Sequence, residues 1–295
     1  MRENDPVTSA TRQPETPAAA LPPRLIATDL DGTLLRDDKS VSERTVAALA
    51  AAEEAGIEVF FVTGRPARWM DVVSDHVHGH GLAICGNGAA VVDLHGGPGA
   101  HRFVKVRELA RENALDAVRL LREAAPGTVF AVEQTYGFYQ EPAYPKLHME
   151  IPDNLAPAEQ LLAPDAPGAG EPVLKILAFH HELDPDAFLT VARRAVGDRA
   201  TLTRSSPSAL LEISGPGVSK ASTLELCCAE RGISPEEVVA FGDMPNDVEM
   251  LTWAGTSYAM GNAHPSVIAA ASGRTVANNE DGVAVVIEKI LAERL

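Results

Sequence analysis

The sequence predicts an α/β fold: a doubly wound (Rossmann-like), mostly parallel sheet core with an inserted α+β cap domain. The first observation is that short apolar runs alternate with helical segments over residues 24–92. The second is that the same alternation returns over residues 206–295. The third is that prolines concentrate between these halves, where the alternation stops. We therefore expect one sheet built from two separated parts of the chain.

The N-terminal half contains a strand–helix–strand unit. A strand is expected at about residues 24–29, and Ser42 has the residue type preferred at a helix N-cap. The alanine-rich segment 45–55 follows as a helix, and Gly56 is placed to end it. The nearly continuous apolar run 57–62 is typical of a strand buried on both faces of a parallel sheet. Its crossover should be right-handed.

The remaining segments define the expected domains. Helices are expected near residues 108–124 and 184–196 of the middle segment, with strands around them. In the C-terminal half, apolar strands are expected at residues 210–213, 238–241 and 257–260. We therefore assign residues 24–92 and 206–295 to the core, residues 93–205 to the cap and residues 1–23 to a disordered leader.

Composition excludes some classes of partner. The chain has 295 residues with 25 Lys and Arg against 41 Asp and Glu, a formal charge of −16. No basic excess exists to neutralise phosphates, which argues against nucleic acid or an anionic membrane as partner. No apolar run reaches the roughly 18 residues that span a bilayer. The three cysteines, Cys85, Cys227 and Cys228, suggest no disulfide framework, so a cytoplasmic location is expected.

The most informative motif is Asp29-Leu30-Asp31-Gly32-Thr33, which follows the apolar run at residues 25–27. Two carboxylates at the end of a buried strand are costly unless a cation lies close to them. A divalent metal is the natural candidate, and Mg²⁺ is commonly held by carboxylates together with a substrate phosphate. Glycine lets the backbone turn sharply, and the threonine adds a hydroxyl near the turn.

Three further motifs belong to the same predicted sheet edge. Thr63-Gly64-Arg65 follows the strand at residues 57–62, and Asp243-Met244-Pro245-Asn246-Asp247 follows the strand at 238–241. Lys220 stands near the start of a helix. Because open α/β sheets bind ligands at the carboxyl ends of their strands, we expect these side chains to meet there.

Each motif alone has a simpler interpretation. Asp-x-Asp-Gly is often a solvated turn or a fragment of a calcium loop. Thr63 could cap the following helix, Lys220 could be a surface lysine, and the Asp243 motif could be a turn with a cap. The conjunction favours a site, because four motifs occur in order and each lies at the predicted ligand edge.

The four motifs resemble those of the haloacid dehalogenase superfamily, and the likeness covers nearly all of the chain after the leader. The long insertion between the Thr63 and Lys220 motifs resembles the type-IIB cap of the Cof-like phosphatases. Asn87-Gly88-Ala89 and Gly261-Asn262-Ala263 also resemble turns of Cof-like members. Pro245 occupies a variable position of the fourth motif and should stiffen that loop.

The resemblance implies a role for each catalytic residue. Asp29 would attack phosphorus and form an aspartyl-phosphate. Asp31 would protonate the leaving oxygen and then deprotonate the hydrolytic water. Thr63 would donate a hydrogen bond to the phosphoryl group, and Lys220 would bond both the phosphoryl oxygens and Asp29.

The resemblance also implies a metal and a substrate site. Mg²⁺ would be held by a carboxylate oxygen of Asp29, the backbone carbonyl of Asp31 and Asp243. Asp247 would lie behind these ligands and orient them. The residues expected to contact substrate are Gly64, Arg65, Asn87 and Asn246.

The expected activity is Mg²⁺-dependent hydrolysis of a small phosphorylated metabolite, such as a sugar phosphate. A phosphomutase is an alternative, because capped relatives can return the phosphoryl group to another hydroxyl. A non-catalytic phosphometabolite-binding protein is a second alternative, although it would not need an acid/base residue beside the nucleophile. We expect a monomer or a homodimer without nucleic-acid or membrane partners.

Overall fold

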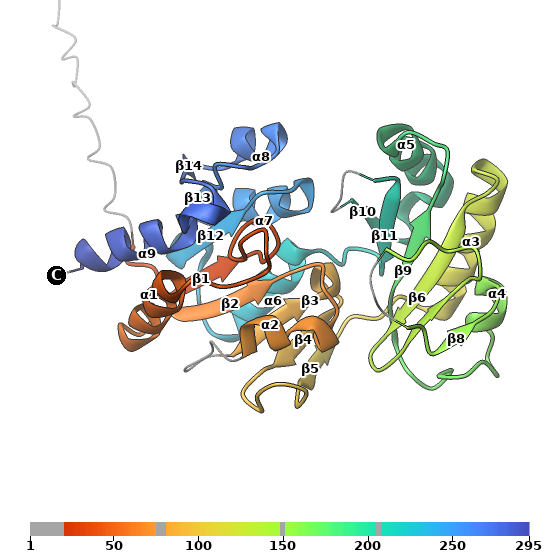
Figure 1. The fold of residues 1–295 in the computed structure, drawn as a ribbon, viewed down its shortest axis with the longest axis horizontal. Helices are drawn as coiled ribbons and strands as arrows, with labels where there is room; N and C mark the ends of the chain where they lie inside the picture. The colour runs from red at the N-terminus through yellow and green to blue at the C-terminus, as the bar shows by residue number, and fades with distance from the viewer. Residues whose placement is uncertain (1–20, 75–80, 148–150, 205–207, 295) are drawn as a thin grey trace, which may run out of the picture.

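A computed structural model describes residues 21–74, 81–147, 151–204 and 208–294. These residues form an α/β core and an α+β cap, each built on its own sheet (Figure 1). Two linkers connect the units, one after residue 106 and one after residue 214. Most of the expected leader, residues 1–20, lies outside the described residues. The predicted fold class is confirmed.

Strands that are far apart in the sequence pair at the centre of the core sheet. β1 (Leu25–Thr28) lies between β2 and β12, and it is parallel to both. The strand order therefore reverses at β1, which makes its carboxyl end a topological switch point where open sheets bind ligands. Within the described residues the order is β14-β13-β12-β1-β2-β3-β4-β5. The other strands are β2 (Glu58–Val62), β3 (Leu82–Cys85), β4 (Ala90–Asp93), β5 (Arg102–Val106), β12 (Val238–Gly242), β13 (Thr256–Ala259) and β14 (Gly273–Arg274).

The core helices form two groups. α1 packs against α9, whereas α6 packs against α7 and α7 packs against α8. Right-handed crossovers that run in opposite directions along a sheet place their helices on opposite faces. No helix in the described part of the chain combines the length and apolarity that crossing a bilayer requires. The core helices are α1 (Glu43–Glu54), α2 (Asp71–Ser74), α6 (Lys220–Glu230), α7 (Val248–Trp253), α8 (Pro265–Ala270) and α9 (Gly282–Ala292).

The strand–helix–strand unit predicted near the N-terminus is confirmed. The Ser42 hydroxyl accepts a hydrogen bond from the Thr45 amide at 3.0 Å, which caps the start of α1. Gly56 has a φ of 78°, a left-handed conformation that ends the helix at little cost for glycine. Every residue of β1 and β12 is buried, as expected for central strands of a sheet covered on both faces.

The cap is a six-stranded sheet with its helices on one side (Figure 1). An apolar core lies between the helices and the sheet, and Phe130, Ile176 and Phe188 are fully buried in it. The sheet order is β10-β11-β9-β6-β7-β8, mostly antiparallel. Its elements are β6 (Val129–Gln134), β7 (Phe138–Gln140), β8 (Asn154–Leu155), β9 (Val173–Phe179), β10 (Thr201–Thr203), β11 (Leu210–Ser214), α3 (Arg111–Ala124), α4 (Ala158–Leu161) and α5 (Pro185–Val196).

Both predicted domain boundaries need correction. β5 lies in the range expected for the cap, 93–205, but it pairs with β4 and extends the core sheet. β11 lies in the range expected for the core, 206–295, but it pairs with β9 and β10 in the cap sheet. The apolar sequence of β11 led to its assignment to the core, because a cap strand buried on both faces is as apolar as a core strand.

Candidate active site

Lys220 joins two of the predicted site residues. It is the first residue of α6, and its side chain is 1% exposed. Its Nζ lies 2.6 Å from Oδ1 of Asp29 and 2.6 Å from Oδ1 of Asp247. Reciprocal hydrogen bonds between Ser219 and Ser222 cap the helix and fix its first turn. Burial alone would lower the pKa of Lys220, but the two aspartates raise it, so the side chain is an ammonium.

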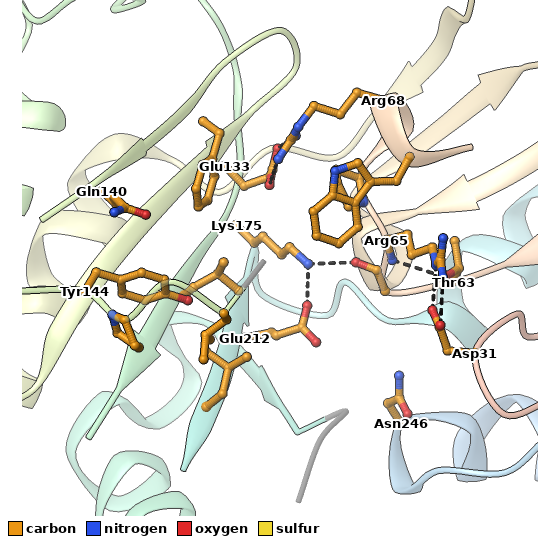
Figure 2. A pocket seen from close by; sticks show the side chains of 18 of the residues that line it. Asp31, Thr63, Arg65, Arg68, Glu133, Gln140, Tyr144, Lys175, Glu212 and Asn246 are labelled. Carbon is orange, nitrogen blue, oxygen red and sulfur yellow. Dashed lines mark hydrogen bonds and ion pairs between the residues drawn. The ribbon is translucent and has the colours of Figure 1, made fainter. Parts of the chain in front are cut away.

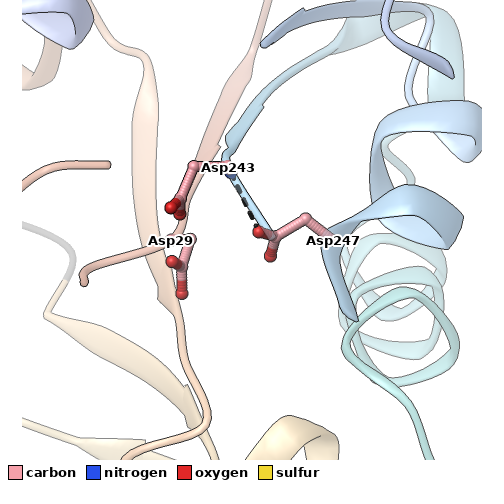
Figure 3. A group of neighbouring side chains, drawn as sticks. All are labelled: Asp29, Asp243 and Asp247. Atoms are coloured by element: carbon pink, nitrogen blue, oxygen red, sulfur yellow. Dashed lines mark hydrogen bonds between the residues drawn. The ribbon is translucent and has the colours of Figure 1, made fainter. Parts of the chain in front are cut away.

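Three buried aspartates form one cluster (Figure 3). One carboxylate oxygen from each of Asp29, Asp243 and Asp247 lies within 4.8 Å of the others. Burial raises the pKa of Asp29 well above its usual range, although Lys220 acts in the opposite direction. Burial and the neighbouring Asp247 raise the pKa of Asp243 to about 6. Three carboxylates beside one ammonium leave negative charge to be balanced, and these oxygen donors fit a divalent cation.

The loop after β1 packs closely against Asp243. Gly32 has a φ of 77°, and a Cβ at this position would lie 2.9 Å from Cγ of Asp243. The Thr33 hydroxyl donates to Oδ1 of Asp243 at 2.9 Å. The Asn262 side chain donates to the Gly32 carbonyl at 2.8 Å, so the Asn262 turn supports the same loop. Neither Thr33 nor Asn262 was predicted to support Asp243, although both stand in motifs that the sequence marks.

Asp247 organises the fourth motif. Its Oδ1 accepts from Lys220, and its Oδ2 accepts from the backbone amides of Asp243 and Met244 at 3.0 Å each. Both carboxylate oxygens of Asp247 therefore have protein partners. Gly242 permits this approach, because a Cβ there would lie 2.6 Å from Cγ of Asp247. The arrangement leaves Asp29 and Asp243 as the carboxylates better placed to accept a cation.

Asp31 lies apart from the aspartate cluster. Its carboxylate accepts from Arg65 at 2.6 and 2.8 Å and from Lys39 at 2.8 Å. Burial would raise the pKa of Asp31, but the bonds from Arg65 and Lys39 lower it to about 2. The Asp31 side chain is therefore an ionised acceptor in this arrangement, and it holds no proton to donate.

The Thr63 motif forms one wall of the cleft. Thr63 is 1% exposed, and its hydroxyl oxygen accepts from the Arg65 amide at 3.1 Å. That geometry leaves the hydroxyl hydrogen available to an incoming acceptor. The Gly64 carbonyl accepts from Lys175 of the cap at 2.8 Å, so this loop also contacts the other domain.

Two hydrogen bonds through Asn246 and Asn87 link the core to the cap. Nδ2 of Asn246 donates to Oδ1 of Asn87 at 3.0 Å, and Nδ2 of Asn87 donates to Thr203 of β10 at 3.3 Å. Asn87 is 1% exposed and does not line the main cavity, so its expected contact with substrate needs correction. Oδ1 of Asn246 is buried without a hydrogen-bond partner among the described residues. Asn246 itself lines the cavity.

One cavity of about 700 Å³ runs from the predicted motifs to the cap (Figure 2). Asp29, Asp31 and Thr63 line its core end, while Lys220, Asp243 and Asp247 do not line it. Its size is typical of small-molecule sites. Further core residues around it are Lys39, Gly64, Arg65, Pro66, Arg68, Trp69, Met244 and Asn246, and the cap contributes Glu133, Phe138, Gln140, Tyr144, Pro145, Lys146, Leu147, Lys175, Leu177, Leu210 and Glu212.

Charged side chains bridge the two domains across this cavity. Lys175 of β9 is ion-paired with Glu212 of β11, and it donates to Gly64 of the core. Arg68 of the core is ion-paired with Glu133 of β6 (Figure 2). Sequence reasoning missed these four residues. For Glu133, Lys175 and Glu212 the available signal was a charged residue inside an apolar strand, since such side chains are rarely buried unless paired. Arg68 lies outside the strands, and no such signal marked it.

The arrangement fits attack on an anionic group. Asp29 faces the cavity and is held from behind by Lys220, so its carboxylate is positioned as a nucleophile. Arg65 and Lys39 supply positive charge at the same end of the cavity. A site that combines a fixed carboxylate with cations suits phosphoryl transfer, where positioning and charge neutralisation dominate.

Comparison with known proteins gives concordant results. A family model for haloacid dehalogenase-like hydrolases matches residues 26–287. The chain is 30% identical over 271 residues to the Bacillus subtilis 5-amino-6-(5-phospho-D-ribitylamino)uracil phosphatase YitU, covering 89% of this chain and 95% of YitU. It is 30% identical over 268 residues to the Escherichia coli pyridoxal phosphate phosphatase YbhA, covering 88% of this chain and 96% of YbhA.

Solved structures agree on the fold. The subclass IIB sugar phosphatase BT4131 superposes with a TM-score of 0.72 at 21% identity, covering 90% of this chain and 98% of that one. A match of this length includes the cap as well as the core. The chain therefore belongs to the haloacid dehalogenase-like hydrolases, as a phosphoric monoester hydrolase whose fold is that of a subclass IIB phosphatase.

Proposed function

We propose that this protein is a Mg²⁺-dependent phosphatase that hydrolyses small phosphorylated metabolites through an aspartyl-phosphate on Asp29. The observation that carries the proposal is the placement of Asp29. Its carboxylate lies at the end of the cavity, 2.6 Å from the buried Lys220 ammonium and beside two further aspartates. A carboxylate held in this way has one face directed to a ligand and its charge balanced from behind.

Asp29 and Asp243 would hold the metal, with the Asp31 backbone carbonyl as the third protein ligand implied by the family. Their oxygens are the hard donors that Mg²⁺ prefers. Burial and the neighbouring carboxylates raise the pKa of both groups, and a bound cation would favour their ionised forms. When bound, Mg²⁺ would supply charge neutralisation for the phosphoryl group.

The proposed first step is attack by an Asp29 oxygen on phosphorus. The new oxygen–phosphorus bond forms as the bond to the leaving alcohol oxygen breaks, and that oxygen takes a proton from Asp31. In the second step water attacks the aspartyl-phosphate, Asp31 takes the water proton, and inorganic phosphate leaves. Lys220 orients Asp29, while the Thr63 hydroxyl and Arg65 bind phosphoryl oxygens.

Asp31 needs a proton for this role, and the structure suggests how it could gain one. Its pKa is held at about 2 by Arg65 and Lys39. A phosphoryl dianion entering the cavity competes for these same two cations. Release of Asp31 from Arg65 and Lys39 would raise its pKa toward the value that burial favours, so substrate binding itself prepares the acid.

The relatives support a small phosphomonoester as substrate. YitU is named for a phosphorylated ribitylaminouracil and YbhA for pyridoxal phosphate. The cavity of about 700 Å³ suits molecules of this size. A sugar phosphate, as expected from the resemblance, belongs to the same size class.

Phosphate release from a panel of phosphorylated metabolites tests the proposal. We expect wild-type protein to release phosphate only with Mg²⁺, and Asp29→Asn to lose at least about a thousandfold in kcat, because an amide is not a nucleophile. Asp198→Asn makes the same chemical change at an exposed position of the cap and should leave turnover unchanged. Equal, metal-independent turnover by wild type and Asp29→Asn would refute the phosphatase proposal.

The same assay separates the alternatives. An isomerised sugar phosphate without free phosphate would identify a phosphomutase. Binding of a phosphate ester without turnover over hours would identify a non-catalytic binding protein. We also propose a cytoplasmic monomer or homodimer with small-molecule partners alone. The three cysteines, all buried and free, and the charge of −16 support that setting.

A further inference from the structure

Arg107 lies on the first linker between core and cap, and its side chain contacts the helix that carries Lys220. Its Nη1 donates to the hydroxyls of Ser222 and Thr223 at 2.7 Å each, and both residues belong to the first turn of α6. Its Nη2 donates to the carbonyl of Gly217 on the second linker at 3.1 Å. Among the described residues, its guanidinium therefore bonds only to the start of α6 and to the linker before it.

The backbone of Arg107 is fixed to the core. Its amide donates to the Ala89 carbonyl at 2.8 Å, one step beyond the pairing of β4 with β5. The Thr223 hydroxyl, which is fully buried, donates in turn to the Gly88 carbonyl at 2.7 Å. A Cβ at Gly88 would overlap the Ser219 carbonyl, so the Gly88 turn packs directly against the helix start. The first turn of α6 is thus held from two sides, by the Gly88 turn and by Arg107.

Helix stability does not account for a cation at this position. The helix dipole places positive partial charge at an N-terminus, so an added cation is unfavourable there. Lys220 already brings one positive charge to this end of α6, and reciprocal bonds between Ser219 and Ser222 already cap it. What Arg107 adds is geometry, because its planar guanidinium presents several N–H donors in a rigid fork. Three bonds from one fork fix the turn with respect to both linkers.

The position of this turn decides where the Lys220 ammonium lies. Lys220 is the first residue of α6, so a displacement of the turn displaces its backbone. Its Nζ lies 2.6 Å from Oδ1 of Asp29 and 2.6 Å from Oδ1 of Asp247, and hydrogen bonds weaken steeply when their geometry changes. Arg107 does not line the cavity, so any effect that it has on the reaction passes through other residues.

We propose that Arg107 is a positioning residue of the phosphatase: by holding the first turn of α6, it keeps Lys220, and through Lys220 the Asp29 carboxylate, in the geometry of attack on phosphorus. This inference rests on the proposed roles of Lys220 and Asp29. It adds a residue that no motif in the sequence marked.

Arg107→Ala and Arg231→Ala form a matched pair that tests this inference. Arg231 follows the last residue of α6, where it donates to the Cys227 carbonyl at 3.0 Å and to Glu58 at 3.1 Å. Each variant therefore removes one arginine from one end of the same helix. We expect Arg107→Ala to lower kcat/KM for p-nitrophenyl phosphate with Mg²⁺ about tenfold, because a small misplacement of a reacting group is costly. Arg231→Ala should stay near wild type.

Three further measurements separate positioning from loss of structure. The Ki of inorganic phosphate reports binding at the same site and does not depend on the active fraction, so in Arg107→Ala it should stay within about twofold of wild type. Urea unfolding gives the folded fraction with which kcat/KM is corrected. Arg107→Lys keeps a charged donor without the fork, and its kcat/KM should lie between those of Arg107→Ala and wild type.

A second variant approaches the same contact from the helix. Thr223→Val replaces an acceptor of Arg107 by a methyl group and should also lower kcat/KM. Unchanged kcat/KM in folded Arg107→Ala or Thr223→Val would overturn this inference and leave the phosphatase proposal intact. So would an equal loss in Arg231→Ala, or a rise in Ki that matches the loss of kcat/KM. No phosphate release by the wild type, from p-nitrophenyl phosphate or from the metabolite panel, would overturn the proposed function as well.

Discussion

At the scale of single residues, the site depends on charges that are buried together. Lys220 is 1% exposed and contacts two aspartates, so these carboxylates, and not bulk solvent, balance the charge of its ammonium. Removing one member of such a buried pair costs about 3–5 kcal/mol, because the remaining charge is left uncompensated. The three aspartates carry more negative charge than Lys220 alone balances, so a bound cation should stabilise the folded protein.

Stabilisation by Mg²⁺ should therefore increase as the pH rises through about 6. The pKa of Asp243 is raised from 3.8 to about 6, and that of Asp29 is raised too. Between pH 3.8 and about 6, Asp243 of the folded, metal-free protein holds a proton that the same residue of the unfolded chain has released. The free energy of unfolding of the metal-free protein therefore falls as the pH rises through this range. Mg²⁺ needs the ionised carboxylate, so its stabilisation is available only once that proton has left.

Thermal unfolding with and without saturating Mg²⁺ measures this effect. We expect a larger increase in Tm at about pH 7.5 than at about pH 5. Asp243→Asn removes the titrating ligand and should abolish most of the increase at both values. The same increase in Tm at both pH values for the wild type would rule out coupling between these protons and the metal.

At the scale of elements, backbone conformation decides where the carboxylates meet. The loop after β1 turns at Gly32 with a φ of 77°, in contact with Asp243 from β12. β1 and β12 are adjacent and parallel, so their carboxyl ends bring Asp29 and Asp243 together although more than two hundred residues separate them. A side chain at Gly32 would occupy the space that the Asp243 carboxylate uses.

Gly32→Ala and Gly56→Ala form a matched pair that tests this point. Both glycines are left-handed, at 77° and 78°, so both substitutions should cost about 1–2 kcal/mol of backbone strain. Only the Cβ at Gly32 meets Asp243, whereas nothing lies within 4 Å of the Cβ at Gly56. We expect Gly32→Ala to lower kcat about a hundredfold and Gly56→Ala to leave it near wild type. Urea unfolding and phosphate release measure the two effects, and equal losses of kcat would contradict the expectation.

At the scale of the whole molecule, closure of the cap on the core completes the cavity. Arg68 and Glu133 pair between the domains, and Lys175 reaches from the cap to the Gly64 carbonyl. Asn87 adds a third contact to Thr203. These bonds surround the cavity rather than the linkers, so they hold the two walls together where a substrate would lie. Weakening them should favour an open arrangement.

Arg68→Ala should therefore raise KM about tenfold, because the closed state that binds substrate becomes less populated. In the absence of substrate, small-angle scattering should show a larger radius of gyration for this variant than for the wild type. Arg102→Ala is the control, since Arg102 is 72% exposed and pairs with Asp93 within the core sheet. Unchanged KM and an unchanged scattering curve would show that the Arg68 bridge does not hold the cap.

Much of the fold was predictable because it follows from local patterns. Apolar runs marked β1, β2 and β12, and a serine and a glycine marked the ends of α1, where backbone chemistry acts over a few residues. The domain boundaries were not predictable in the same way. β5 and β11 were assigned to the wrong units because pairing partners, not the strand's own sequence, decide which sheet a strand joins.

The catalytic end of the site was set by the sequence itself. Asp29, Lys220 and Asp243 stand at strand ends or a helix start, and the order of a doubly wound sheet is enough to bring them to one edge. Only the tertiary structure decided the rest: the bonds from Arg65 to Asp31, the position of Asn87 behind Asn246, and the apolar wall of the cap. The physical reason is that the first two contacts depend on how loops after different strands of the core sheet pack together, and the third on how the cap sheet faces the core. No local pattern encodes those distances or angles.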